Sequence, residues 1–212
     1  MNVSNVLVIA NKLATTRRYS NSRLIQDENL LEHVGFVSFF ALTTARELNS
    51  VKPNSIDMAE VLEKAILHDL EECETGDTPR PTKYYSKEVR QAFEVVESAG
   101  VDKVLEDMQL LPETADFMKH TWVAAKDAKS GSVIKLADIA AVIYKMHSEV
   151  TLMGNLSMLH TCRSVPEYLR DIRTVLELVW DDNTDALKYL MSICDQLNEL
   201  AVVATSRGNG VL

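Results

Sequence analysis

The stretch DMAEVLEKAILHDLEECE, residues 57–74, decides the fold and carries the most informative polar side chains of the chain. Asp57, followed three residues later by a glutamate, resembles a capping box and predicts the start of a helix. The apolar residues at helical spacing behind it are Met58, Leu62 and Ala65. The same face continues into His68, Asp69 and Glu72, where a helix that only packs would keep apolar side chains.

These three polar residues are spaced so that their side chains converge. Glu72 lies four positions after His68 and three after Asp69, which places them on one side of a helix. An imidazole and a carboxylate are natural ligands for Zn²⁺, Mn²⁺, Fe²⁺ or Co²⁺. The pattern therefore favours a metal site at the end of this segment.

Two more polar residues lie in apolar surroundings elsewhere in the chain. His33 falls beside the apolar stripe of a helix expected over 28–48, and Asp138 falls within the apolar run LADIAAVI. Each has a plain structural interpretation, because a helix histidine is often a hydrogen-bonded core residue and Asp138 can pair with Lys135. The hypothesis of a metal site depends on all of these residues together.

The rest of the chain also has the spacing of helices, and we expect one all-α domain over residues 1–205. The predicted helices are 28–48, 57–74, 86–97, 112–128 and 133–153, with a long final helical region over 166–204. Residues 75–82 form the loop densest in Pro and Gly, and residues 206–212 are expected to be a flexible tail. No alternating run is long enough to predict a strand.

Composition limits the kinds of partner that the chain can bind. The 212 residues carry 22 Lys and Arg against 31 Asp and Glu, for a formal charge of −9, which argues against binding a nucleic acid polymer. The uncharged stretch Val34–Ala45 is too short to span a bilayer, and no signal peptide is evident. The three cysteines predict reduced thiols, so we expect a cytoplasmic protein without a membrane partner.

The order of these motifs resembles the HD-domain superfamily of metal-dependent phosphohydrolases. Residues 68–84, HDLEECETGDTPRPTKY, are similar to the bacterial 5′-deoxynucleotidase branch, which shows His-Asp, a Glu three residues later, Thr-Gly-Asp, alternating prolines and Lys-Tyr. That branch also places an Arg and an aromatic residue about 15 residues before the first His, where this chain has Arg18-Tyr19 instead of the usual Arg-Trp. The resemblance covers roughly residues 15–155.

The resemblance implies an HD-type helical bundle and a divalent metal, Co, Mn or Zn, held by His33, His68, Asp69 and Asp138. It also implies hydrolysis of deoxyribonucleoside 5′-monophosphates by metal-activated water, and usually a homodimer or higher homo-oligomer. Within that framework Asp69 and Glu72 are the expected catalytic residues, with Glu72 transferring the proton.

The expected substrate-binding residues are Arg18 for the phosphate, Asp77 for the sugar 3′-hydroxyl, Tyr19 for the sugar face and Lys83 for the pocket wall. By composition alone, Arg17 is an equal candidate for the phosphate. The departure at Tyr19 leaves the preference for deoxyribose over ribose open, and the sequence leaves the base preference open as well.

Two other functions fit the same residues. A deoxynucleoside triphosphate triphosphohydrolase would use the same metal site, with added positive charge from Arg80, Lys83, Arg17 or Arg23 beyond the first phosphate. A non-catalytic nucleotide-binding helical protein is the third hypothesis, although such a relative would be expected to lack a ligand or the catalytic Glu.

Overall fold

The computed structural model describes residues 2–126 and 128–209, with side chains as far as Ser206, and it confirms the all-α prediction. These ranges contain no strand and one isolated bridge, between Arg17 and Asn29. The helices are α1 (Val3–Thr15), α2 (Leu30–Val51), α3 (Met58–Leu67), α4 (Glu72–Thr75), α5 (Arg80–Lys83), α6 (Lys87–Met108), α7 (Pro112–Val123), α8 (Ala128–His147), α9 (Leu159–Cys162), α10 (Val165–Val179) and α11 (Thr184–Asn209). The shorter turns are η1 (Ala124–Lys126), the π-helical η2 (Ser148–Leu152) and η3 (Leu156–Met158).

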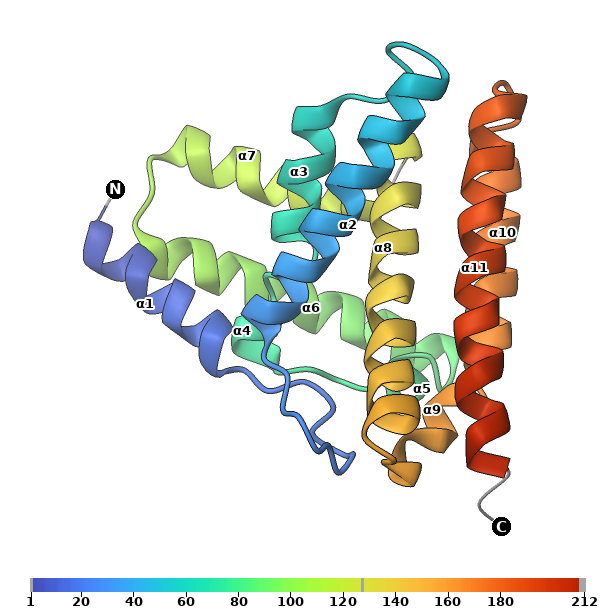
Figure 1. Ribbon diagram of the computed structural model, residues 1–212. Coiled ribbons are helices and arrows are strands. Elements are labelled where there is room, and N and C mark those ends of the chain that lie inside the picture. The colour runs from blue at the N-terminus through green and yellow to red at the C-terminus, as the bar shows by residue number, and fades with distance from the viewer. Residues whose placement is uncertain (1, 127, 210–212) are drawn as a thin grey trace.

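The larger of two hydrophobic cores surrounds α8, which packs against α2, α3, α10 and α11 (Figure 1). The predicted apolar stripe of α2 is buried, since Leu30, Val34, Val37, Ala41 and Ala45 are each at most 5% exposed, and the last three belong to this core. Asn29 caps the helix through a reciprocal capping box with Glu32. The packed stripe and the cap together fix which face of α2 points inward, and His33 lies on that face.

A smaller core joins α1, α6 and α7 to the end of α3. Leu67 and Leu70 contribute to it, and both flank His68-Asp69 in the sequence. The His-Asp pair is thus held at the seam between the two cores, where packing on both sides limits its freedom.

The predicted continuous helix over 57–74 is wrong after Leu67. Residues 68–71 form tight turns in which the amide of Leu70 donates to the carbonyl of Leu67 and that of Glu72 donates to Asp69, both at 3.1 Å. In a turn with three residues per repeat, the side chains at positions i and i+3 lie nearly above one another. The interruption therefore lets the side chains of Asp69 and Glu72 face the same side.

Other boundaries differ from the prediction because tertiary contacts extend or interrupt the local pattern. Helix α1 was not predicted, and α6 continues eleven residues beyond the predicted end at residue 97. The predicted final helix over 166–204 is two helices, because the chain turns at the buried Trp180 and Asn183 caps α11 through the amide of Ala186. Helix α11 runs to Asn209, past the predicted start of the tail, and residues 210–212 of that tail lie outside the described residues.

Candidate active site

Three separate elements bring four candidate metal ligands together. His33 comes from α2, His68 and Asp69 from the turn after α3, and Asp138 from α8. The ligand atoms of His33, His68 and Asp138 lie within 4.8 Å of one another. Oδ2 of Asp69 lies 3.1 Å from Nε2 of His68 and 3.4 Å from Nε2 of His33. The four residues predicted as metal ligands thus share one small volume.

The donor set fits a divalent cation in its chemistry. The ring of His68 is oriented by a 2.8 Å hydrogen bond between its Nδ1 and the carbonyl of Ala65, which directs Nε2 toward the other donors. Nε2 of His68 lies 3.4 Å from Nε2 of His33, and Oδ1 of Asp138 lies 3.3 Å from Nε2 of His33. Two imidazole nitrogens and two carboxylates suit Zn²⁺, Mn²⁺ or Co²⁺, and the side chain of Asp138 is 41% exposed, so the site opens to solvent.

Charge interactions within the site shift the pKa values of its ligands. Burial alone would lower the pKa of His68, but the carboxylate of Asp69 raises it to about 9. Burial alone would raise the pKa of Asp69, yet the neighbouring imidazoles of His68 and His33 hold it well below its usual range. Against the effect of burial, the imidazole of His33 likewise lowers the pKa of Asp138. The carboxylates of Asp69 and Asp138 are therefore ionised at neutral pH, as ligands for a cation must be.

Arg18 reaches the site from the loop between α1 and α2. The bridge between Arg17 and Asn29 closes this loop, and the amide of Arg18 donates to the carbonyl of Glu28 at 2.9 Å. The buried guanidinium faces four carboxylates: Glu28 at 3.3 Å, Asp69 and Glu72 each at 3.5 Å, and Asp77 at 3.9 Å. Arg17, the alternative phosphate ligand, points away instead, because it is 75% exposed and pairs with Asp27.

Asp77 and Tyr19 are joined directly. The backbone amide of Tyr19 donates to Oδ2 of Asp77 at 2.8 Å, and Tyr19 has a left-handed φ of 56°. Gly76, with φ 71° and ψ 162°, makes the turn that delivers Asp77 to this position, in a conformation open essentially to glycine alone. The hydroxyl of Tyr19 is buried and has no hydrogen-bond partner among the described residues.

Glu72 and Lys83 form the other wall of the site. Nζ of Lys83 donates to Oε1 of Glu72 at 3.2 Å, while Oε2 of Glu72 is buried without a hydrogen-bond partner in the described chain. Burial and the nearby Asp69 raise the pKa of Glu72 well above its ordinary value, against the lowering effect of Arg18 and Lys83. A carboxyl group with a raised pKa is suited to transferring a proton.

Three acidic residues in or beside this site were missed by the sequence prediction. Glu28 pairs with Arg18, and Glu97 pairs with Lys83 at 3.2 Å. Glu71 is buried and accepts a 2.7 Å hydrogen bond from the indole of Trp122. The signal available for Glu71 and Glu97 was acidity within helices that otherwise bury apolar residues, but helix periodicity alone does not separate a buried Glu from a solvated one.

The fold and this arrangement of donors define the class of the protein as an HD-domain phosphohydrolase. The structure is similar to that of the PH0347 protein from Pyrococcus horikoshii OT3, with a TM-score of 0.68 and 18% identity over 94% of this chain and 99% of that one. It is also similar to the cyanophage S-2L HD phosphohydrolase DatZ, solved with dA and one catalytic Zn²⁺, with a TM-score of 0.62 and 16% identity over 94% and 98%.

The chain belongs to the YfbR-like 5′-deoxynucleotidase family, whose sequence profile matches residues 5–189. It is 30% identical over 152 residues to 5′-deoxynucleotidase PM0747 of Pasteurella multocida, covering 71% of this chain and 76% of that protein. It is 24% identical over 157 residues to 5′-deoxynucleotidase YfbR of Escherichia coli O1:K1, covering 73% and 77%. The family and the hydrolase class predicted from the sequence are thereby confirmed.

The structure also bears on two predictions made from composition. In the described ranges no helix is both long and apolar enough to cross a bilayer. Cys73, Cys162 and Cys194 are free thiols, as predicted from the absence of any paired spacing.

Proposed function

We propose that this protein releases phosphate from deoxyribonucleoside 5′-monophosphates, with a divalent metal held by His33, His68, Asp69 and Asp138. The observation that carries the proposal is the convergence of these four donors beside a buried arginine. A divalent cation bound there would polarise a phosphoryl oxygen and lower the pKa of a coordinated water toward about 7. The identity of the metal, Co, Mn or Zn, is a matter for reconstitution.

Arg18 is the group that would hold the substrate phosphate. Its guanidinium is planar, always charged and matched to phosphate oxygens, and it is directed at the metal donors rather than at solvent. Its present partners are carboxylates at 3.3 to 3.9 Å. A phosphate dianion would replace part of that contact, so phosphate recognition is compatible with the acidic charge of the chain.

Glu72 would transfer the proton that the reaction requires. Its buried Oε2 has no hydrogen-bond partner in the described structure and lies 3.5 Å from Arg18, on the side where the phosphate would bind. With its pKa raised by burial, Glu72 can donate a proton to the leaving 5′-oxygen of the nucleoside. Asp69, which touches both histidines and Arg18, would link the metal to the phosphate clamp.

Asp77 and Tyr19 are proposed to bind the sugar. Oδ2 of Asp77 is engaged by the amide of Tyr19, which leaves Oδ1 to accept a hydrogen bond from the 3′-hydroxyl. The ring of Tyr19 packs against the larger core and would face the sugar at the position of the usual Trp. Lys83 would complete the pocket wall next to Glu72.

The competing triphosphohydrolase function would need free positive charge beyond the first phosphate. Arg80 is turned toward α10, where it pairs with Asp171 at 3.2 Å and stacks on Tyr84 and Tyr168 at 4.8 and 4.9 Å. Lys83 is engaged by Glu72 and Glu97. Arg17 pairs with Asp27, so three of the four candidate cations are engaged, which favours the monophosphate as the substrate, whereas Arg23 is exposed. The complete donor set with Glu72 argues against a non-catalytic protein.

The test is a panel of dNMPs, NMPs and dNTPs with protein reconstituted separately with Mn²⁺, Co²⁺ and Zn²⁺. We expect orthophosphate from dNMPs, and we expect Asp69→Ala to lose both turnover and bound metal. Inorganic triphosphate released from dNTPs would favour the triphosphohydrolase. If no metal supports release and Asp69→Ala keeps the wild-type metal content, the site assignment is wrong.

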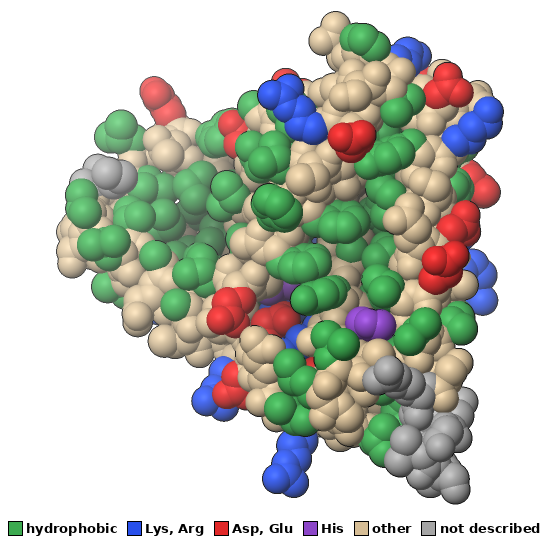
Figure 2. Space-filling view, viewed as in Figure 1, with side chains coloured by type: hydrophobic (Ala, Val, Ile, Leu, Met, Phe, Trp, Pro, Cys, Tyr) green, Lys and Arg blue, Asp and Glu red, His purple; other side chains and the backbone are tan. Residues whose placement is uncertain are grey.

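A homodimer or higher homo-oligomer also remains part of the proposal. On the face shown in Figure 2, hydrophobic side chains gather over α1 and α2, and Leu7 and Phe39 of those helices are 63% and 71% exposed. Exposed apolar surface of this kind is typical of subunit contacts. Light scattering coupled to gel filtration measures the oligomeric state. A cytoplasmic location, without a nucleic acid polymer or a membrane as partner, is also still a prediction.

A further inference from the structure

A row of alternating charges leads from the proposed proton-transfer group to the surface. Lys83 lies between two carboxylates, 3.2 Å from Oε1 of Glu72 and 3.2 Å from Oε1 of Glu97. The second oxygen of Glu97 accepts a 2.9 Å hydrogen bond from Arg90, whose Nε pairs with Glu94 at 3.3 Å. Each oxygen of Glu97 therefore has its own cation.

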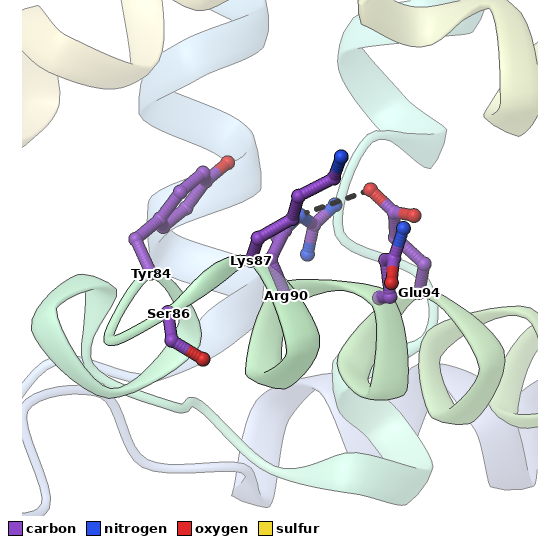
Figure 3. Close-up of a pocket in the computed structure, with 6 residues that line it drawn as sticks. Tyr84, Ser86, Lys87, Arg90 and Glu94 are labelled. Carbon is purple, nitrogen blue, oxygen red and sulfur yellow. Dashed lines mark ion pairs between the residues drawn. The ribbon is translucent and has the colours of Figure 1, made fainter.

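Glu97 differs from an ordinary helix glutamate in its burial. Its side chain is 4% exposed, while that of Glu94, one turn earlier on α6, is 57% exposed. Figure 3 shows the outer end of the row, where Arg90 and Glu94 line a surface pocket of about 370 Å³. A buried carboxylate is retained at a cost in desolvation, and here the two cations on its oxygens offset that cost.

The position of Lys83 depends on this buried carboxylate. A lysine side chain has four rotatable bonds and samples many conformations unless its ammonium is held. With Glu72 as its single carboxylate partner, the ammonium would keep more of that freedom. Glu97 supplies the opposing contact from α6, so the ammonium stays on Oε1 of Glu72 and leaves Oε2 clear.

We propose that Glu97 is a positioning residue that acts through Lys83 to orient Glu72 for proton transfer. The inference rests on the proposed function, because it assigns Glu97 a part in the same reaction. In the described structure the carboxylate of Glu97 pairs with Lys83 and Arg90, and with neither the metal donors nor Arg18. Its effect must therefore pass through Lys83.

A double-mutant cycle tests that dependence. Glu97→Gln should lower kcat about 10-fold with KM within about twofold of wild type, a typical loss for an outer partner of an active site. Lys83→Met should also lower kcat, and the double variant should be no slower than Lys83→Met alone. Bound metal should be unchanged in all three. The matched control is Glu106→Gln, which removes an exposed carboxylate of the same helix outside the row and should leave kcat unchanged.

The outcomes separate this inference from the proposed function. Wild-type protein that turns over no deoxynucleotide contradicts the proposed function. If the wild type is active and Glu97→Gln keeps the wild-type kcat, the role of Glu97 is overturned. The same holds if the kcat losses of the two single variants multiply in the double variant. If Glu97→Gln folds poorly, Glu97→Asp takes its place in the same cycle. Independently of turnover, a crystal structure of either variant should show the Lys83 ammonium displaced from Glu72, and an unchanged contact contradicts the proposal.

Discussion

Tyr19 adopts a backbone conformation that costs an ordinary L-residue about 1 to 2 kcal/mol. The carboxylate of Asp77 stabilises it by accepting the amide hydrogen of Tyr19. Asp77→Ala should therefore release the loop and raise KM for a dNMP by about 10-fold, since a hydrogen bond to a charged acceptor is worth about 1.5 to 3 kcal/mol. Asp77→Asn keeps an oxygen acceptor and should retain more affinity. Equal KM values for the two variants would contradict this role.

The hydroxyl of the same tyrosine leads to a second prediction at the residue scale. It is buried without a hydrogen-bond partner among the described residues, and an unmade buried hydrogen bond costs about 1 to 3 kcal/mol. Tyr19→Phe removes the hydroxyl and keeps the ring, so the metal-free protein should melt a few degrees higher. A lower melting temperature in differential scanning calorimetry would show that the hydroxyl has a stabilising partner.

At the scale of elements, Glu149 of η2 holds the loop that carries Arg18. Its buried carboxylate accepts hydrogen bonds from the amides of Ile25 and Gln26 at 2.9 and 3.0 Å and pairs with Lys145 at 3.2 Å. Burial alone would raise the pKa of Glu149, but these donors and Asn155 lower it. A lowered pKa in the folded state means that this stabilisation is present at neutral pH and is lost as pH falls through the folded pKa.

Glu149→Gln should accordingly destabilise the protein by about 2 kcal/mol at pH 7. The difference in free energy of unfolding between wild type and variant should shrink below about pH 4, as the wild-type carboxylate becomes protonated. Urea unfolding at several pH values measures this difference, and Glu199→Gln, at an exposed position, is the control. A difference that stays constant from pH 7 to pH 3 would exclude this role of ionised Glu149.

The contact between α7 and the turn at residues 68–71 gives another test. Trp122→Phe removes the indole donor and leaves the buried carboxylate of Glu71 without that hydrogen bond. We expect a loss of about 1 to 3 kcal/mol, or roughly 2 to 4 °C in melting temperature for each kcal/mol in a domain of this size. Phe117→Leu, at an exposed position of the same helix, should change the melting temperature little.

The sequence predicted best those elements whose local pattern and tertiary packing agree. The stripe of α2 is such a case, because its apolar spacing and its burial select the same residues. In α3 the apolar spacing and the burial select different residues. Val61, Lys64 and Ala65 are buried, whereas Met58 and Leu62 are only partly buried. The reason is that α3 packs against α2 on one side and against α7 and α8 on others. The end of α3 at Leu67 depends on contacts with the second core, which local spacing does not contain.

The residues of the site divide in the same way. The pattern singles out His33, His68, Asp69 and Asp138 because each is polar in or beside an apolar stripe or belongs to a dense motif, and the structure brings the four together. Glu97 and Glu149 lie in helices of mixed polarity, and only the folded structure shows that α6 brings the one to Lys83 and η2 brings the other to the loop before α2. Long-range pairing of this kind has no signature in a single sequence.

At the scale of the whole molecule, the metal would join α2 and α8 of the larger core to the turn after α3, which lies at the seam between the two cores. A ligand that binds only the folded state stabilises it by about 2.7 kcal/mol at 100 times its Kd. Saturating Mn²⁺ should then raise the melting temperature by about 5 to 10 °C, and EDTA should reverse the rise. Asp138→Asn should reduce this response, and a full response in that variant would remove Asp138 from the ligand set.

The ring of acids around Arg18 has a consequence for the end of the catalytic cycle. Glu28, Asp69, Glu72 and Asp77 surround the guanidinium when no phosphate is present. When the nucleoside has dissociated, these carboxylates can pair with Arg18 again and displace the remaining inorganic phosphate. The enzyme should therefore resist product inhibition, with a Ki for orthophosphate well above KM for the nucleotide, because the sugar contacts that help the substrate displace the acids are missing from the product.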